Sequence, residues 1–342
     1  DFYLTDAISD DAQENIRNHA REHSESPFFL YLAYTAPHWP LHALPEDIAK
    51  YEAFYEGKSF AEIRRSRFEK MKSIGVLPKG AALSEPSHQD WSEVNQSLNT
   101  RRMAVYAAMV DCMDRGIGQV IKALKDTGQL ENTLICFMTD NGADSSTSIG
   151  HNNAVGCLGG EAITRDGRPI SISGDEFPGD ETTFQSYGSD LANVSNTPYR
   201  YFKLRSYEGG IRSPFILHWP AGIESSRRGS VDQEMISHLI DLSPSFLRLA
   251  GEPVPESMDG ISVAQYWNGK QTGNPKRTLF NDFGKSSAVY EYPWKLVSDR
   301  ANSFLFNIEK DASETRDIAA DHPERFEAMK RELAAWKSAF EE

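Results

Sequence analysis

The spacing of apolar residues changes along the chain, and each change predicts a different element. Over residues 10–23 the apolar positions recur at helical intervals, and they do so again over the longer stretch 100–127. Continuous apolar runs at 28–34, 133–139 and 215–220 are typical of buried strands, and the second of these runs is typical of a central parallel strand covered on both faces. Strands that alternate with helices indicate a layered α/β fold.

The segments between these runs are more polar. Residues 46–75 predict a charged helical surface, and residues 235–249 predict another helix, capped by Ser237 or Asp232. The stretch 143–197 is rich in Gly, Ser, Asp and Thr and shows little periodicity. Because it is too long for a plain connection, we interpret it as a functional surface insertion or a partly mobile segment.

Beyond residue 251 the chain is punctuated by Pro and Gly, and the expected elements become shorter. The candidate strands and the closing helix are 278–283, 287–298, 303–308 and 322–340. We therefore expect two parts. Residues 1–250 should form an α/β domain with a mostly parallel central sheet flanked by helices, and residues 251–342 a subdomain of a small antiparallel sheet plus a helix.

Composition narrows the class of protein. The 342 residues are 39% hydrophobic, and no apolar run approaches the roughly 18 residues that a membrane-spanning helix needs, so no membrane span is expected. Thirty-six Lys and Arg against 50 Asp and Glu give a net charge of -14, which argues against nucleic acid as a partner. A site for an anionic ligand would have to rely on a few basic residues grouped close together.

The cysteines bear on the redox compartment of the protein, and the first residues bear on how the chain begins. Cys112, Cys136 and Cys157 cannot all pair with one another, and they leave the redox compartment open. The chain opens at Asp1, without an initiator Met and without the basic and apolar pattern of a signal peptide. We expect a truncated or processed chain.

Polar residues that follow the apolar runs are the candidates for chemistry, because ligands of open α/β sheets bind beyond the carboxyl ends of the strands. Asp140 and Asn141 follow the run 133–139 and offer two hard oxygen donors, which suit Ca²⁺ or Mg²⁺. The alternative is a simple turn, since Asn-Gly is a strong turn dipeptide. A hairpin would need a partner strand directly after Gly142, and none is visible.

Two basic residues are further candidates. His38 lies in a rigid Pro-bounded loop after the first apolar run; a lone His is usually structural, but its near-neutral pKa suits it to hand a proton to a leaving oxygen. Lys203 by itself would be read as a solvated surface charge. The nearby Glu208-Gly209-Gly210 allows close backbone approach, which favours a functional loop.

Several segments resemble, in order and spacing, the formylglycine-dependent sulfatases, and the arylsulfatase-like branch in particular. These segments are TAPHWPLHA at 35–43, MAVYAAMV at 103–110, MDRGIG at 113–118, TDNGA at 139–143, YEGGIR at 207–212 and LFNIEKDASETRDIA at 305–319. The resemblance covers nearly the whole chain and implies an alkaline-phosphatase-like fold, with 1–250 as a truncated catalytic domain.

The resemblance also implies a site and a reaction. Asp140 and Asn141 would be two calcium ligands, and His38 and Lys203 would contact the sulfate and leaving-group oxygens. A formylglycine would attack the sulfur of an aryl or carbohydrate sulfate ester, so the expected partner is a small-molecule or glycan sulfate ester. We expect the leaving-group side to be shaped by the 143–197 insertion together with Trp39, His42 and His151.

The sequence departs from the family pattern in its upstream part. The formylglycine is made within a Cys/Ser-x-Pro-Ser/Ala-Arg motif, and no such motif precedes His38; the string SEPSH at 84–88 lacks the arginine. Two donors alone would hold Ca²⁺ weakly, because it takes six to eight oxygens. We therefore expect the nucleophile and further ligands in a missing N-terminal segment, an inactive chain on its own, and a complementing N-terminal fragment as a candidate partner.

One smaller departure is Tyr207, where relatives of this branch carry His before Glu-Gly-Gly, and we expect it to alter the leaving-group pocket. Two other hypotheses stay open. The protein would be an inactive sulfated-ligand-binding pseudoenzyme, or a phosphodiesterase or phosphonate hydrolase of the same superfamily. By resemblance alone, a periplasmic or extracellular location is favoured.

Overall fold

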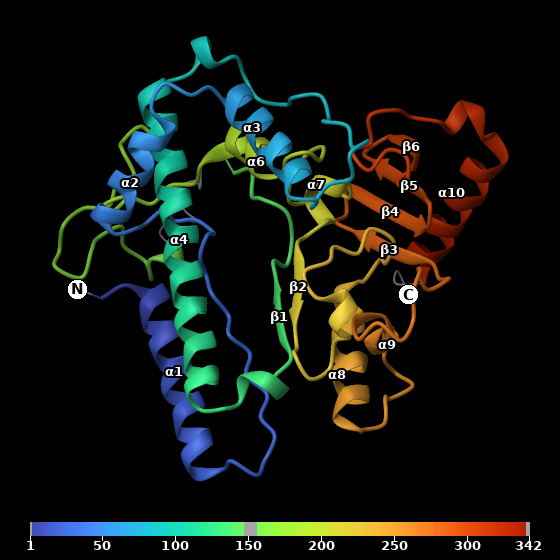
Figure 1. Ribbon diagram of the computed structural model, residues 1–342. Helices are drawn as coiled ribbons and strands as arrows, with labels where there is room; N and C mark the ends of the chain where they lie inside the picture. The colour runs from blue at the N-terminus through green and yellow to red at the C-terminus, as the bar shows by residue number, and fades with distance from the viewer. Residues whose placement is uncertain (1, 147–155, 340–342) are drawn as a thin grey trace. The chain divides into compact units, whose positions relative to one another are not determined.

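A computed structural model describes residues 2–146 and 156–339 (Figure 1). Contacts between residues divide the chain into two compact, interleaved units. Unit 1 comprises Asp1–Ser66, Pro86–Leu130 and Ala143–Ser195, and unit 2 comprises Arg67–Glu85, Glu131–Gly142 and Asn196–Glu342. The boundary predicted at residue 250 stays a prediction.

Unit 1 is mainly helical. Helices α1 and α2 both pack against the long helix α4, which begins where the Asn95 side chain accepts a hydrogen bond from the Leu98 N–H (Figure 1). Arg115 of α4 makes a two-pronged ion pair with Asp47 of α2, at 2.8 and 2.6 Å. The helices are α1 (Leu4–Glu22), α2 (Pro45–Tyr55), α4 (Gln96–Asp126), α6 (Gly188–Ser195) and the 3₁₀ helix η1 (Trp91–Glu93); α3 (Phe60–Ser73) begins in this unit.

The prediction of a buried strand at 28–34 is wrong. The segment forms no strand, and the side chains of residues 28–31 are exposed to solvent, with Phe29 77% and Tyr31 81% exposed. An apolar run becomes a strand only where neighbouring strands satisfy its backbone. Among the residues that the structure describes in unit 1, there are isolated bridges but no strand ladder for it to join.

Unit 2 contains both sheets. In the smaller one, β1 (Ile135–Met138) pairs with β2 (Phe215–His218), which confirms strands in both predicted runs. The expected parallel pairing of β1 is wrong here: Met138 lies opposite Phe215 and Ile135 opposite His218, so the strands are antiparallel. The first residue of β2 therefore lies opposite the last residue of β1, so the segments that follow β1 and precede β2 are at the same end of this sheet.

The C-terminal sheet confirms the predicted small antiparallel sheet with one packed helix (Figure 1). One face packs Val289, Leu296 and Leu305 against Met329 and Leu333 of the last helix. The run expected as one strand at 287–298 turns back on itself and forms two. The strands lie in the order β3 (Leu279–Asp282), β4 (Ser286–Glu291), β5 (Trp294–Asp299) and β6 (Asn302–Asn307), and the helix that packs on them is α10 (Pro323–Ser338).

Shorter helices complete unit 2. The helix expected from residue 235 begins later, because the His238 side chain, rather than Ser237 or Asp232, accepts the capping hydrogen bond from the Ile240 N–H. The remaining helices are η2 (Leu130–Asn132), α7 (Glu208–Ile211), η3 (Ser225–Arg227), η4 (Leu239–Asp241), α8 (Leu242–Ala250), α9 (Ala264–Trp267) and η5 (Ala319–Asp321). No helix in 2–146 or 156–339 has both the length and the apolar character needed to cross a membrane.

Candidate active site

The residues that follow β1 lie against the residues that precede β2. Asp140, Asn141 and Gly142 form a bend directly after the strand, and the Gly142 N–H donates to the Gly210 carbonyl oxygen at 2.9 Å. A Cβ atom on Gly142 would lie 1.8 Å from the Gly209 carbonyl oxygen, so only glycine permits this approach. The two predicted calcium donors are thereby held beside the Glu208-Gly209-Gly210 segment.

Lys203 lies on a turn that folds over the same two glycines. A Cβ atom on Gly209 would lie 2.2 Å from the Arg200 carbonyl oxygen, and one on Gly210 would lie 2.0 Å from that of Arg205. The Gly209 N–H donates to the Arg200 carbonyl oxygen at 3.0 Å, which closes the turn. The structure therefore brings the turn of Lys203 and the bend of Asn141 onto one pair of glycines.

The backbone on either side of Lys203 is strained. Tyr201 and Leu204 have φ angles of 60° and 68°, in the left-handed region that side chains other than glycine rarely adopt. Such strain persists only where the surroundings hold the backbone firmly, and it is common in ligand-binding loops. The loop 199–212 therefore depends on its anchors.

The C-terminal sheet provides those anchors. Arg205 donates to both carboxylate oxygens of Asp299 in β5, at 2.6 and 2.8 Å, and the Ser206 N–H donates to the Ser286 hydroxyl of β4 at 2.8 Å. Tyr207 is buried against Phe306 of β6, on the sheet face opposite α10. In this position the Tyr207 ring supports the loop from beneath, and its predicted effect on the leaving-group pocket stays a prediction.

A buried network of three charges lies beneath the loop, and sequence reasoning missed it. Lys295 of β5 and Glu314 are both 0% exposed, and Glu208 is 3% exposed. The Lys295 ammonium donates to Glu208 and to Glu314 at 2.8 Å each, and the Glu208 N–H donates to the second oxygen of Glu314 at 2.7 Å. Buried charges are tolerated only when they are paired and hydrogen-bonded in this way.

The two carboxylates of this network differ in acidity. Burial raises the pKa of Glu314 to about 7, against the attraction of Lys295. Burial acts on Glu208 in the same direction, but the positive charges of Lys295 and Arg212 outweigh it, and the pKa of Glu208 is lowered. One signal was present in the sequence: Lys295 stands two residues before the buried Val297, at a position that faces the core.

His38 lies in unit 1, on the exposed bend after residue 35. Its Nδ1 lies 2.9 Å from the Trp39 carbonyl oxygen. Because a carbonyl only accepts hydrogen bonds, Nδ1 carries a proton in this contact. The Trp39 carbonyl oxygen therefore orients the His38 ring, and the catalytic role predicted for His38 stays a prediction.

The residues after His38 are tied to the 143–197 segment. The His42 Nε2 lies 2.6 Å from the Thr183 carbonyl oxygen, and burial lowers the pKa of His42, which leaves a neutral ring donating to that carbonyl. The Trp39 ring packs edge-on against Phe184. His151 lies outside the described residues. The substrate-binding roles expected for Trp39, His42 and His151 stay predictions.

The donors for a metal ion are incomplete within the described residues. Asp140 is exposed and Asn141 half-buried, and both offer the oxygen atoms that Ca²⁺ prefers. Residues 2–146 and 156–339 contain no group of three or more His, Cys, Asp or Glu side chains placed to hold a metal ion. Asp140 and Asn141 fit part of a calcium shell and would need further oxygen donors.

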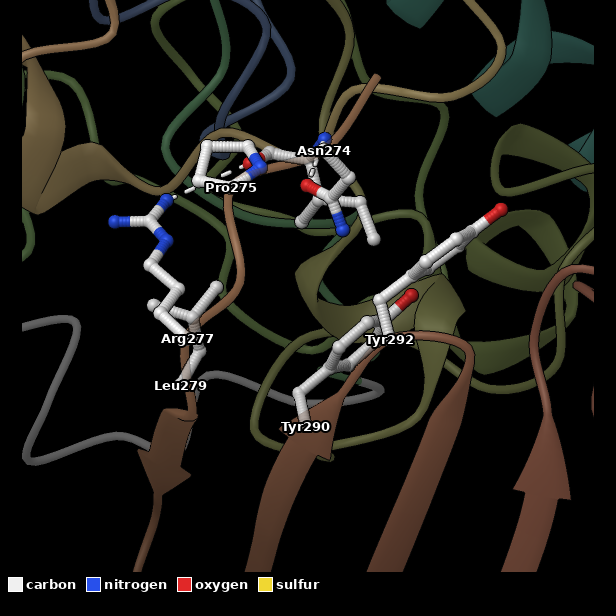
Figure 2. Close-up of a pocket in the computed structure, with 7 residues that line it drawn as sticks. Asn274, Pro275, Arg277, Leu279, Tyr290 and Tyr292 are labelled. Atoms are coloured by element: carbon white, nitrogen blue, oxygen red, sulfur yellow. Dashed lines mark hydrogen bonds between the residues drawn. The ribbon is translucent and has the colours of Figure 1, made fainter.

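A small pocket at the edge of β3 and β4 contains none of the residues predicted from the sequence (Figure 2). Its volume of about 10 Å³ is room for roughly one water molecule. Arg277, which lines it, is already paired with both carboxylate oxygens of Asp241. The pocket is thus too small and its cation too engaged to hold a sulfate ester. It is lined by Ile236, Asn274, Pro275, Arg277, Leu279, Tyr290 and Tyr292.

Known proteins match this chain over most of its length. The sulfatase family profile matches residues 1–252, and the profile of the N-sulphoglucosamine sulphohydrolase C-terminal region matches residues 198–337. An arylsulfatase of Klebsiella aerogenes is 33% identical over 256 residues, 73% of this chain and 51% of that protein. An uncharacterized sulfatase of Schizosaccharomyces pombe is 33% identical over 263 residues, 74% of this chain and 44% of that protein.

The comparison of structures agrees. The crystal structure of Ps i-CgsB superposes with a TM-score of 0.63 at 27% identity, covering 98% of this chain and 55% of that one. The chain thus spans about half the length of the relatives it matches. The predicted α/β class, that of the alkaline-phosphatase-like superfamily, is confirmed. With the family profile matched from residue 1 to residue 252, the chain belongs to the sulfatase family.

Proposed function

We propose that this chain forms one wall of the active site of an enzyme that hydrolyses sulfate esters. The observation that carries the proposal is the packing of two loops on Gly209 and Gly210. One loop bears the oxygen donors Asp140 and Asn141, and the other bears the cation Lys203. A sulfate ester needs this combination, because its oxygens must be held while the bond between sulfur and the leaving oxygen breaks.

Each basic residue has a different task in this proposal. Lys203 donates to the oxygens that gain negative charge as the ester bond breaks, which stabilises the transition state more than the bound substrate. His38 gives a proton from Nε2 to the departing oxygen, since Nδ1 is committed to the Trp39 carbonyl oxygen. Both tasks belong to the complete protein.

Two further groups belong to the proposal and come from the family resemblance. Calcium would be held by Asp140 and Asn141 together with donors outside the described residues, and it would draw electron density from the sulfate oxygens. A formylglycine would supply the nucleophile, and the sequence carries no Cys/Ser-x-Pro-Ser/Ala-Arg motif ahead of His38 from which to form it. We therefore propose that this chain alone is inactive.

The substrate class is aryl or carbohydrate sulfate. One relative bears the name arylsulfatase, and the related Ps i-CgsB has been solved in complex with k-i-k-neocarrahexaose, at 26% identity and a TM-score of 0.62. The side chains on the leaving-group side would be Trp39, His42 and His151. A small-molecule or glycan sulfate ester is thus the proposed partner.

We also propose that an N-terminal segment complements this chain. Support comes from the exposed apolar run at its beginning, where Phe28, Phe29, Leu30 and Tyr31 are all more than one-third exposed. Contiguous apolar surface of this kind commonly marks a contact with another segment or chain. A segment that pairs with this run would cover it.

The direct test compares turnover of an aryl sulfate with that of the matching aryl phosphate by the full-length protein. We expect steady-state hydrolysis of the sulfate and a much lower kcat/KM for the phosphate. The reverse preference would favour a phosphodiesterase or phosphonate hydrolase of the same superfamily. Tight binding of the sulfate without turnover would indicate a pseudoenzyme that only recognises sulfated ligands.

A further inference from the structure

We propose that Lys295 and Glu314 are positioning residues for Lys203: acting through Glu208, they hold the loop 199–212 in the shape that presents Lys203 to a sulfate ester. The inference rests on the proposed function, since it assigns the buried network a task at that site. Neither residue belongs to a segment that carries a proposed contact with the substrate.

The first step runs from the buried network to Glu208. The Glu208 carboxylate receives a hydrogen bond from Lys295, and the Glu208 N–H donates one to Glu314, so both its side chain and its backbone are held. Lys295 also bonds to Glu314, which closes the network into a ring of contacts. Glu208 cannot shift without leaving a buried charge unpaired, and such a loss is strongly unfavourable.

The second step runs from Glu208 to Lys203. Gly209 and Gly210 follow Glu208 directly, and the carbonyl oxygens of residues 200, 201, 202 and 205 crowd the space where their Cβ atoms would be. Lys203 lies within this stretch, flanked by the two left-handed residues Tyr201 and Leu204. Because the contacts are this close, a displacement of Glu208 is transmitted to the backbone of Lys203.

The position of Lys295 in the sheet supports a role beyond the stability of the sheet. Lys295 lies on the sheet face that carries Val297 and Phe306 and packs against Tyr207 of the loop. The opposite face packs Val289, Leu296 and Leu305 against α10, and its ion pair between Lys337 and Asp282 is partly exposed rather than buried. If this position served packing alone, an apolar residue would be sufficient. A hydrogen-bonded ion network, in contrast, has a fixed geometry and so favours a single loop conformation.

The test is a double-mutant cycle in the full-length protein, with kcat/KM for an aryl sulfate as the readout. Glu314→Gln keeps the shape of the side chain and replaces the ionisable carboxyl group that contacts Lys295 and the Glu208 N–H with a neutral amide. We expect it to lower kcat/KM ~10-fold or more, the scale of loss for a catalytic group displaced by a fraction of an ångström to one ångström. In the Lys203→Ala background the same substitution should add less than about a further 3-fold, because its effect acts through Lys203.

Independent losses that multiply in the double mutant would overturn the proposal, as would an unchanged kcat/KM for Glu314→Gln. The matched control is Lys337→Met, which breaks the ion pair with Asp282 on the α10 side and should leave kcat/KM unchanged. Should Glu314→Gln fail to fold, Glu314→Asp, which keeps the charge but shortens the reach, takes its place with the same expectations.

A second readout separates this inference from the proposed function. If the wild-type protein hydrolyses no sulfate ester, the proposed function fails, and amide hydrogen exchange in this chain decides the positioning role. Amides of 199–212 should exchange ~10-fold faster in Glu314→Gln than in wild type, while those of α4 stay unchanged. Equal exchange in both proteins would overturn the role of Glu314.

Discussion

Lys203 lies on a turn whose shape depends on two glycines, Gly209 and Gly210, against which it packs. The backbone oxygens of Arg200 and Arg205 occupy the places of the missing Cβ atoms of Gly209 and Gly210. At this scale the sequence predicted candidate residues, because His38, Asp140 and Asn141 follow apolar runs and Lys203 stands near Glu208-Gly209-Gly210. It could not indicate Glu314, whose role depends on a burial that a charged tail segment does not suggest.

The basic residues should act on the rate rather than on folding. In the full-length protein we expect Lys203→Ala and His38→Ala each to lower kcat for an aryl sulfate by ~100-fold or more, the usual effect of losing a transition-state contact or a proton donor. The exposed Lys285 on the β3–β4 turn serves as the control, and Lys285→Ala should keep the wild-type kcat. Unchanged rates in the first two variants would remove both residues from the site.

Gly210 should tolerate no side chain. A Cβ atom there would lie 2.0 Å from the Arg205 carbonyl oxygen, so Gly210→Ala must push the Lys203 turn away, at a cost of roughly 1–3 kcal/mol in the free energy of unfolding. Thermal unfolding of this chain would measure the loss. Gly80→Ala is the control, because nothing lies within 4 Å of its Cβ position. Equal melting temperatures for both variants would contradict the close approach.

At the scale of elements, the two faces of the C-terminal sheet have different roles. Its α10 face is an ordinary apolar core, and its other face supports the loop 199–212 with Tyr207, Arg205 and the Lys295 network. The alternating pattern predicted these strands and the helix that covers them. We expected the run 287–298 as one strand, although Pro293, in the two-residue turn between β4 and β5, marked a break that sequence reasoning missed.

The network should make stability depend on pH. The pKa of Glu314 is raised by burial to about 7, from 4.5 in the unfolded chain, so the folded state favours the protonated form. The stability that this preference contributes is fully present below pH 4.5 and is lost as the pH rises through 7.

Comparison with Glu314→Gln isolates this effect from the other titrating groups. Between pH 5 and pH 8, denaturant unfolding should show the wild-type chain losing stability relative to Glu314→Gln, because the neutral Gln cannot ionise. His42 and His238, whose pKa values are lowered by burial, titrate in both proteins and cancel in the comparison. A difference that stays constant with pH would contradict the raised pKa.

At the scale of the whole molecule, this chain spans about half the length of the relatives it matches. We expect the full-length protein to retain calcium through purification and the Asp140→Ala variant to lose it, because one of few strong oxygen donors is removed. Elemental analysis would measure the metal content, with Asp126→Ala, on the exposed end of α4, as the control. Normal calcium in Asp140→Ala would refute that assignment.

The sequence by itself determined the family, the helices α1 and α4, the strands β1 and β2, and the small C-terminal sheet, because these follow from local periodicity and from motifs read along the chain. Only the tertiary structure decided that 28–34 stays exposed, that β1 and β2 run antiparallel, and that Lys295 and Glu314 meet Glu208 beneath the Lys203 loop. The physical reason is the same in each case. Strand pairing and the burial of a charge depend on partners distant in sequence, and no local pattern specifies those partners.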